Sequence, residues 1–104
     1  MQFILDSKLY DTATATTVAI SRGLVEDPRG LPEGADSKRY EDVLYRTRAG
    51  NFFMHSHETV KFPRGKPVVA DSARALTPQG AIDWIQQSGA MILDPAGLPL
   101  PEEA

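Results

Sequence analysis

The chain contains no cysteine among its 104 residues. This absence excludes disulfides, thiolate metal sites and cysteine nucleophiles, and it is typical of proteins from reducing compartments. No apolar stretch approaches the roughly 18 residues that a membrane-spanning helix needs. The opening residues, Met1–Asp6, lack the charged and apolar regions of a signal peptide. We therefore expect a cytoplasmic protein that does not contact a membrane.

The sequence also lacks the motifs that mark common catalytic sites. Neither a Gly-x-Ser-x-Gly nucleophile elbow nor a Gly-x-x-x-x-Gly-Lys-[Ser/Thr] phosphate loop occurs. Ser56, His57 and Asp71 supply the residue types of a hydrolytic triad, but no sequence motif places them together. We therefore expect that the protein is not an enzyme and binds no cofactor.

The residues that are present are ordinary in amount and uneven in distribution. Hydrophobic residues make up 41% of the chain and charged residues 24%, which is typical of one small globular domain. The formal net charge is −3, yet the segment 38–74 holds eight lysines and arginines against four acids. A basic middle between acidic ends can steer a partner of opposite charge.

The clearest predicted element is a β-hairpin. Two segments, 42–47 and 51–57, flank the loop Arg48-Ala49-Gly50, and a glycine at the third loop position fits a type I turn followed by a G1 bulge. That turn predicts a register in which Tyr45 faces Phe53. Since side chains alternate along a strand, we expect the face that carries these two rings to be buried, because the arginines lie on the other face.

Two helices are expected. One covers Pro78–Ser88, because Thr77 suits the N-cap, proline suits the first turn and Gly89 suits the C-cap. The other covers 12–22. The many threonines of this second segment favour strands, so a strand over 16–21 is the alternative.

Short strands are also expected over 3–5, 68–70 and 90–93. Together these elements predict an α+β fold: a small antiparallel sheet built on the central β-hairpin, with two helices packed on one face. Residues 1–93 would form the single domain. Residues 94–104 would form a flexible tail that is rich in proline and acidic residues.

The sequence His55-Ser56-His57 is the one pattern that suggests a metal. On a strand the two imidazoles project from the same face about 7 Å apart, which is close enough to share a zinc ion. A third ligand is usually needed, and Glu58 points to the opposite face of a regular strand. A hydrogen-bonded or solvated histidine pair is the ordinary alternative, so we expect no metal unless His55 and His57 find that ligand.

The basic middle of the chain supplies the candidate binding site. Its cations, with Phe52 and Phe53 among them, resemble a platform of stacking rings and phosphate-facing charges for a single nucleic-acid strand. The two rings alternate faces, however, so at least one belongs to the core. Trp84 lies beside the apolar stripe of its helix and is a candidate anchor. The candidate binding residues are Arg46, Arg48, Lys61, Arg64, Lys66 and Trp84.

Three segments occur in an order that resembles a widespread group of small, mostly uncharacterised proteins of bacteria, phages and other mobile elements. They are LYDTATA at 9–15, YEDVLYRTRAGNFFMH at 40–55 and LTPQGAIDW at 76–84. Members often carry a glycine-rich segment where this chain has Ser56–Lys61, and the loop 24–38 also departs from the pattern. The resemblance implies a small α+β fold and a bacterial host cell, and it brings no catalytic residues.

Some small phage proteins of this size inhibit host defences, including CRISPR effectors. By this analogy of context, we expect a non-enzymatic protein-binding or inhibitor module of a phage or mobile element, such as an anti-CRISPR protein. Its partner would be a larger host protein or nucleoprotein complex. Direct nucleic-acid binding through the segment 38–74 is the alternative, and a metal-dependent hydrolase at His55 and His57 is the third hypothesis.

Overall fold

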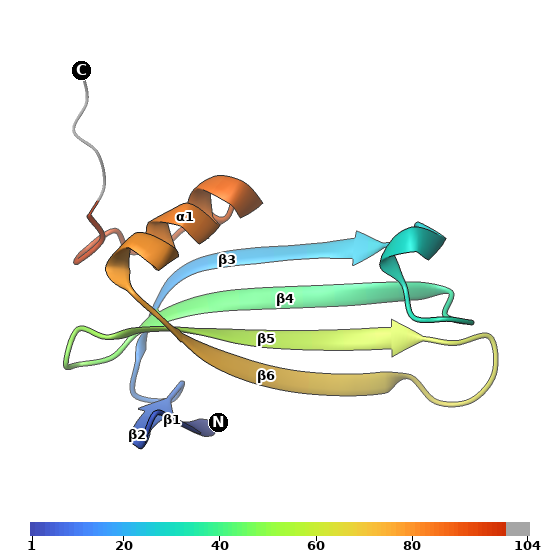
Figure 1. The fold of residues 1–104 in the computed structure, drawn as a ribbon, viewed down its shortest axis with the longest axis horizontal. Coiled ribbons are helices and arrows are strands. Elements are labelled where there is room, and N and C mark those ends of the chain that lie inside the picture. The colour runs from blue at the N-terminus through green and yellow to red at the C-terminus, as the bar shows by residue number, and fades with distance from the viewer. Residues whose placement is uncertain (100–104) are drawn as a thin grey trace.

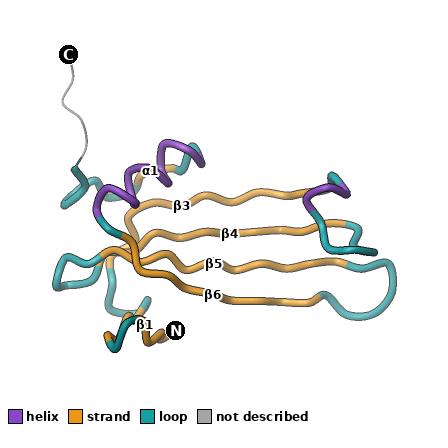
Figure 2. Tube along the Cα trace, in the orientation of Figure 1, coloured by secondary structure: helices purple, strands orange, loops and turns teal. Residues whose placement is uncertain are grey.

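The computed structural model describes residues 1–99 of the chain. Long antiparallel strands form a five-stranded sheet, in the order β6-β5-β4-β3-β7, and a separate two-stranded hairpin precedes it (Figures 1 and 2). The elements are β1 (Gln2–Leu5), β2 (Lys8–Asp11), β3 (Thr16–Val25), the 3-10 turn η1 (Pro28–Gly30), β4 (Ser37–Arg46), β5 (Phe52–Lys61), β6 (Val68–Leu76), α1 (Pro78–Ser88) and β7 (Met91–Ile92).

The predicted central hairpin is confirmed in both its turn and its register. Tyr45 pairs with Phe53 across β4 and β5. The backbone N–H of Thr47 donates to the carbonyl of Asn51 at 2.8 Å, which closes the three-residue loop. Gly50 has a φ of 87°, and this left-handed conformation is the reason for glycine at that position.

The predicted C-terminal helix is confirmed as α1. The side-chain oxygen of Thr77 accepts a hydrogen bond from the backbone N–H of Gly80 at 3.0 Å, which satisfies one of the free amides of the first turn. Gly89 ends the helix with a φ of 64°, the left-handed conformation that favours glycine there. Within residues 1–99 this helix of 11 residues is the longest, and no helix is long and apolar enough to cross a membrane.

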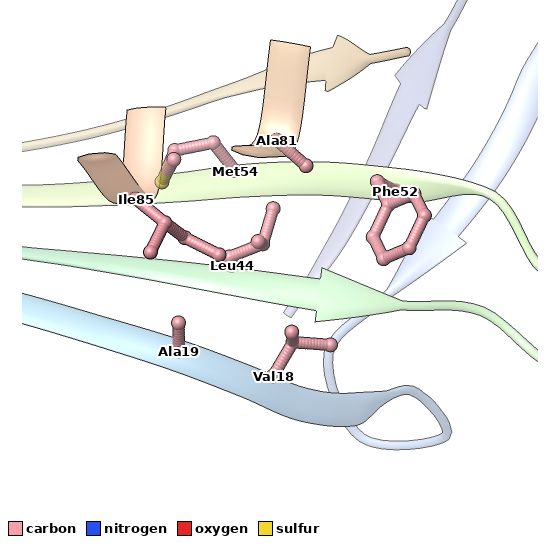
Figure 3. Close-up of a cluster of buried hydrophobic side chains, with 7 residues drawn as sticks. All are labelled: Val18, Ala19, Leu44, Phe52, Met54, Ala81 and Ile85. Atoms are coloured by element: carbon pink, nitrogen blue, oxygen red, sulfur yellow. The ribbon is translucent and has the colours of Figure 1, made fainter. Parts of the chain in front are cut away.

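One face of the sheet packs against α1 (Figure 3). Ala81 and Ile85 of the helix meet side chains from the three central strands and form a buried hydrophobic cluster with them. A β-bulge in β3 inserts Val18 between two regular pairs. The strand members of the cluster are Val18, Ala19, Leu44, Phe52 and Met54.

The opposite face packs against the N-terminal hairpin. Tyr10 of β2 lies with its ring centroid 5.2 Å from that of Phe53, and Tyr45 stacks on Phe53 at 5.1 Å. Phe3 of β1 contacts the ring of His55 at 5.2 Å. The face of Tyr45 and Phe53 is therefore covered as expected, but the face that carries Leu44 and Met54 is covered as well.

The expected α+β fold with two helices on one face is wrong. Residues 1–99 hold one α-helix, and the molecule is mostly β. The segment 12–22, expected as a helix, contributes instead to β3, because threonine, valine and isoleucine are stiff at χ1 and pack well on a pleated sheet. The strand alternative over 16–21 lies inside β3, which continues to Val25.

The C-terminal part of the chain was expected as a flexible tail over residues 94–104. Within the described part, the carboxylate of Asp94 forms an ion pair with Arg46 at 3.0 Å. Leu98 packs against the buried cluster between α1 and the sheet. Two amides, those of Leu93 and Asp94, donate to the carbonyl of the bulged Val18. Residues 94–98 are thus attached to the sheet, and residues 100–104 lie outside the described part.

The two covering elements occupy the same end of the sheet. Figure 1 shows α1 and the β1–β2 hairpin beside one end of the long strands, whereas the other end carries connecting loops and the short turn η1. No residue of β3 after Ala19, of β4 before Val43 or of β5 after Met54 is buried. The radius of gyration of 15.4 Å exceeds the roughly 13 Å of a compact domain of this length.

We call the two parts the covered half and the bare half. The bare half consists of the segments Ser21–Val25, Ser37–Asp42, Ser56–Lys61 and Val68–Ser72. About five residues of each strand extend beyond the core, which at about 3.3 Å per residue corresponds to roughly 17 Å of sheet.

Candidate functional site

A shallow groove lies on the bare half. It has a volume of about 500 Å³ and is open to solvent. Because side chains alternate along each strand, most of its lining comes from one face, the one that carries the N-terminal hairpin at the covered end. The groove is lined by Arg22, Gly23, Leu24, Arg39, Tyr40, Glu41, His57 and Thr59.

The groove carries charges of both signs. Arg22 of β3 lies 3.6 Å from Glu41 of β4, with both side chains about half exposed, so this pair is screened and contributes little to stability. Arg39 forms no ion pair with any other described residue. The groove can therefore meet a polar surface of mixed charge, with one cation that pairs with no other residue in the described part of the chain.

At the edge of the groove a carboxylate joins the two histidines of β5. One oxygen of Asp71, in β6, lies 2.8 Å from Nε2 of His55 and 2.8 Å from Nδ1 of His57. The strand register explains the contact, since His57 pairs directly with Asp71 and His55 is two residues away on the same face. Hydrogen bonds from His57 and then His55 lower the pKa of the Asp71 carboxyl.

The cluster connects the covered half to the bare half. The His55 side chain is only 16% exposed and its ring contacts Phe3 of the N-terminal hairpin, whereas the His57 side chain is 46% exposed in the groove. Asp71 thus holds one imidazole against the hairpin and orients the other toward solvent. The chemistry that this geometry offers is hydrogen bonding through His57.

The structure does not assemble the hydrolytic set or the metal set considered from sequence. Ser56 lies on the opposite face of β5 from its two histidine neighbours, so it cannot reach His57 as a nucleophile. His55 and His57 do share a face as predicted, but both direct a ring nitrogen to the same carboxylate oxygen. No three side chains within residues 1–99 are arranged to hold a metal ion.

The other face of the bare half carries side chains that contact across neighbouring strands. The ring of Tyr40 lies over Gly23 of the neighbouring strand, so closely that a Cβ atom on this glycine would come 2.6 Å from the phenol oxygen. Beside it, Lys38 of β4 lies 3.7 Å from Glu58 of β5. The bare half is thus supported by cross-strand pairs instead of a core.

The cations predicted as one binding surface lie in three different places. Arg46 is 17% exposed, pairs with Asp94 and donates to the carbonyl of Ala96. Its guanidinium is therefore already used to attach the C-terminal segment, and its role as a binding residue stays a prediction. Arg48 is exposed in the β4–β5 turn at the covered end.

The remaining three cations lie at the far end of the sheet. Lys61 is the last residue of β5, and Arg64 and Lys66 lie in the β5–β6 turn that follows. All three are at the opposite end of β5 from Arg48, which corresponds to roughly 30 Å along the strand. The predicted binding cations are thus spread over two ends and both faces of the sheet. They do not form the continuous positive stripe that binding to a phosphate backbone requires. Trp84 is half-buried against the α1 cluster, also away from this turn.

The β5–β6 turn is the most concentrated positive charge of the described chain. Residues 61–67 include three cations and no acid, and none of the three forms an ion pair with another described residue. The neighbouring β3–β4 loop, residues 26–36, holds four acids and one base. The backbone N–H of Asp36 donates to the carbonyl of Lys61 at 2.8 Å, so the two loops meet. The tip of the bare half is therefore acidic on one side and basic on the other.

Sequence reasoning missed the roles that three residues play in this region. Arg39 and Glu41 line the groove, and Asp71 bonds the two histidines. The alternation along β4 could have placed Arg39 and Glu41 on one face. Asp71 required the register of β6, which the irregular β5–β6 turn did not reveal.

Comparisons with known proteins add no assignment. No family model, no curated protein and no solved structure matches this chain.

Proposed function

We propose that this chain is a non-enzymatic binding module that docks on a larger protein through the bare half of its sheet. The observation that carries the proposal is the position of α1 and the N-terminal hairpin, which both cover the same end of four long strands. The remaining strands extend roughly 17 Å from the core. The segments of β3, β4 and β5 in the bare half add no buried side chain to the core. Their length is explained if they serve as a surface for a partner.

The chemistry of the bare half supports a protein partner. The groove combines an apolar side chain, Leu24, which is 45% exposed, with Arg39, Glu41 and His57. Surfaces that mix an apolar centre with charges of both signs resemble the core and rim of transient protein interfaces. The cations, by contrast, are too scattered for a nucleic-acid backbone. The inhibitory role that the resemblance to mobile-element proteins implies stays a prediction.

Site-specific photo-crosslinking tests the proposal. Benzoylphenylalanine is placed at Thr59 in the groove, and as a matched control at Gln86, which is exposed on α1. We expect cells that encode the chain to yield a discrete protein adduct at position 59 and none at 86. Loss of that adduct in the charge-reversal variant Arg39→Glu would assign it to the groove.

Three results would contradict the proposal. They are the absence of a discrete adduct at position 59, an adduct of equal yield at 86, and an adduct that nuclease treatment removes. The last of these would favour direct nucleic-acid binding. Thermal melts of the variants show whether each remains folded, so that a lost adduct is not attributed to unfolding.

A further inference from the structure

The outer edge of β6 is free along the bare half. β6 is the last strand of the sheet, and on its other side it pairs with β5 without interruption from Val60↔Val68 to Phe52↔Leu76. No described residue outside β5 hydrogen-bonds the backbone of Val68–Leu76. Residues Val68–Ser72 are all exposed, whereas the later residues lie beside the N-terminal hairpin, which contacts β6. An uncovered row of amides and carbonyls is a template for another strand.

This edge has one charged residue, Asp71, and otherwise lacks the usual protection against pairing. Natural edge strands are commonly interrupted by proline, lysine or a bulge, and Val68–Ser72 contains none of these. The opposite edge of the sheet differs, because β3 is bulged at Val18 and is partly covered by β7. The exposed side chains of Val68 and Val69, each more than half exposed, suit contacts with an added strand.

The charge beside the edge specifies the chemistry of the added strand. The basic turn 61–67 leads directly into Val68, and its three cations are unpaired among the described residues. An added strand would therefore place its nearer end in a positive field, where carboxylates are favoured. All pairs of this sheet are antiparallel, and in that direction the nearer end of an added strand is its C-terminal end.

We propose that β6 binds an extended segment of the partner protein by antiparallel strand addition, with acidic residues at the C-terminal end of that segment beside the β5–β6 turn. This inference rests on the proposed function, because it names how the docked partner is recognised. Backbone hydrogen bonds to Val68–Ser72 supply the general affinity, and Lys61, Arg64 and Lys66 select the acidic end.

A second copy of this chain fits the edge less well. Pairing of two Val68–Ser72 segments would bring one carboxylate toward each basic turn, that of Asp71. That carboxylate is already bonded to His55 and His57. The two paired segments would then offer no further carboxylate to the cations of either turn, so the observations on the described residues favour a different, acidic segment.

A pair of synthetic peptides tests the proposal on the full chain. One is Thr-Val-Thr-Val-Thr-Glu-Glu-Glu, and the other has the three glutamates moved to its N-terminal end. Binding is followed by NMR on the ¹⁵N-labelled protein. We expect the first peptide to shift the amides of Val68–Ser72 and slow the exchange of alternate ones, and to bind about fivefold or more tightly than the second, as two or three screened ion contacts would give.

Variants separate the contribution of the basic turn from that of the β6 backbone. The double variant Arg64→Glu and Lys66→Glu should abolish the difference between the peptides, whereas Arg48→Glu, in the turn at the opposite end of the sheet, should preserve it. Prolines at Val69 and Ala70 test the backbone contacts. Amides alternate along a strand, so one of the two prolines removes an outward donor while keeping the pairing with β5, and thermal melts identify it. That variant should lose peptide binding.

Several outcomes would overturn the proposal. Equal binding of both peptides would remove the selection for an acidic end, and shifts confined to residues outside both β6 and the segment 61–67 would place the peptide elsewhere. Shifts of Val68–Ser72 that grow with protein concentration alone, with a dimer mass by light scattering, would make a second copy the occupant. If a protein adduct forms at Thr59 but the peptides do not shift the amides of β6, the proposed binding function is kept and strand addition at β6 is rejected.

Discussion

The covered and bare halves of one sheet are stabilised in different ways, although the same strands run through both. In the covered half, the largest fully buried side chains are Phe53, Leu44, Met54 and Val18. In the bare half, the contacts are backbone ladders and exposed cross-strand pairs such as Lys38–Glu58, which contribute about 0.2–1 kcal/mol each. The comparison teaches that the core at one end carries the stability, so the other end is available for a partner.

The largest expected effect is in the covered half. Phe53→Ala removes the ring that Tyr10 and Tyr45 both contact, and it leaves a cavity on the hairpin face of the sheet. We expect the free energy of unfolding to fall by about 3–5 kcal/mol, measured by urea denaturation.

The matched change in the bare half is Leu24→Ala. This side chain is 45% exposed, so we expect the free energy of unfolding to change by no more than about 0.5 kcal/mol. A loss of several kcal/mol for Leu24→Ala would contradict the division of the molecule into two halves, since it would mean that the bare half has a core of its own.

The next effect concerns the helix that covers one face. Thr77→Ala removes the hydroxyl that accepts from the amide of Gly80, and we expect a loss of about 1 kcal/mol in a denaturation experiment. The control is Gln79→Ala, which removes only the exposed hydrogen bond to Asp83 one turn later and should cost about 0.3 kcal/mol. Equal losses would show that the cap adds nothing beyond a surface contact.

The elements that could be predicted from the sequence are those defined by local chemistry. Gly50 requires a left-handed conformation, and it specifies the β4–β5 turn and its register. Thr77 and Gly89 delimit α1 by satisfying free backbone groups at its two ends. Each of these signals acts within a few residues, so no knowledge of the rest of the chain is needed.

The features that could not be predicted depend on contacts between distant segments. Arg46 looks like a surface cation in sequence, but it pairs with Asp94, which is 48 residues away. The segment that forms β3 has the length and the glycine for a helix, and pairing with β4 decides otherwise. The carboxylate of Asp71 reaches His55 and His57 only through the register of β6, which the sequence of the preceding turn does not specify.

A smaller effect tests how the bare half is held together. Gly23→Ala places a Cβ atom 2.6 Å from the phenol oxygen of Tyr40, so the ring must move off the neighbouring strand. Because the displaced group is the end of a flexible side chain outside the core, we expect a loss of no more than about 1 kcal/mol. NMR should show altered Tyr40 ring signals with little change at Phe53. A loss comparable to that of Phe53→Ala would contradict this interpretation.

The smallest expected effect lies at the boundary between the two halves and depends on pH. Hydrogen bonds from His57 and His55 lower the pKa of Asp71 in the folded chain, while the unfolded chain keeps a value of about 3.9. The unfolded state therefore binds the proton more readily, and the charged carboxylate stabilises the fold above about pH 4. This contribution is lost as the pH falls through the lower pKa of the folded state.

Asp71→Asn isolates that contribution. The stability of the unsubstituted chain minus that of the variant should shrink as the pH falls from about 5 to below about 4, as measured by thermal melts at each pH. Asp94, whose pKa is lowered first by the backbone N–H of Ala96 and then by Arg46, titrates in both proteins and cancels in the difference. Ser72→Asn is the control, because it introduces the same side chain at the next residue and removes no ionisable group, so its offset should not vary with pH. If the stability difference for Asp71→Asn is also independent of pH, the two imidazoles do not stabilise the charged carboxylate. The cluster would then not join the covered half to the bare half.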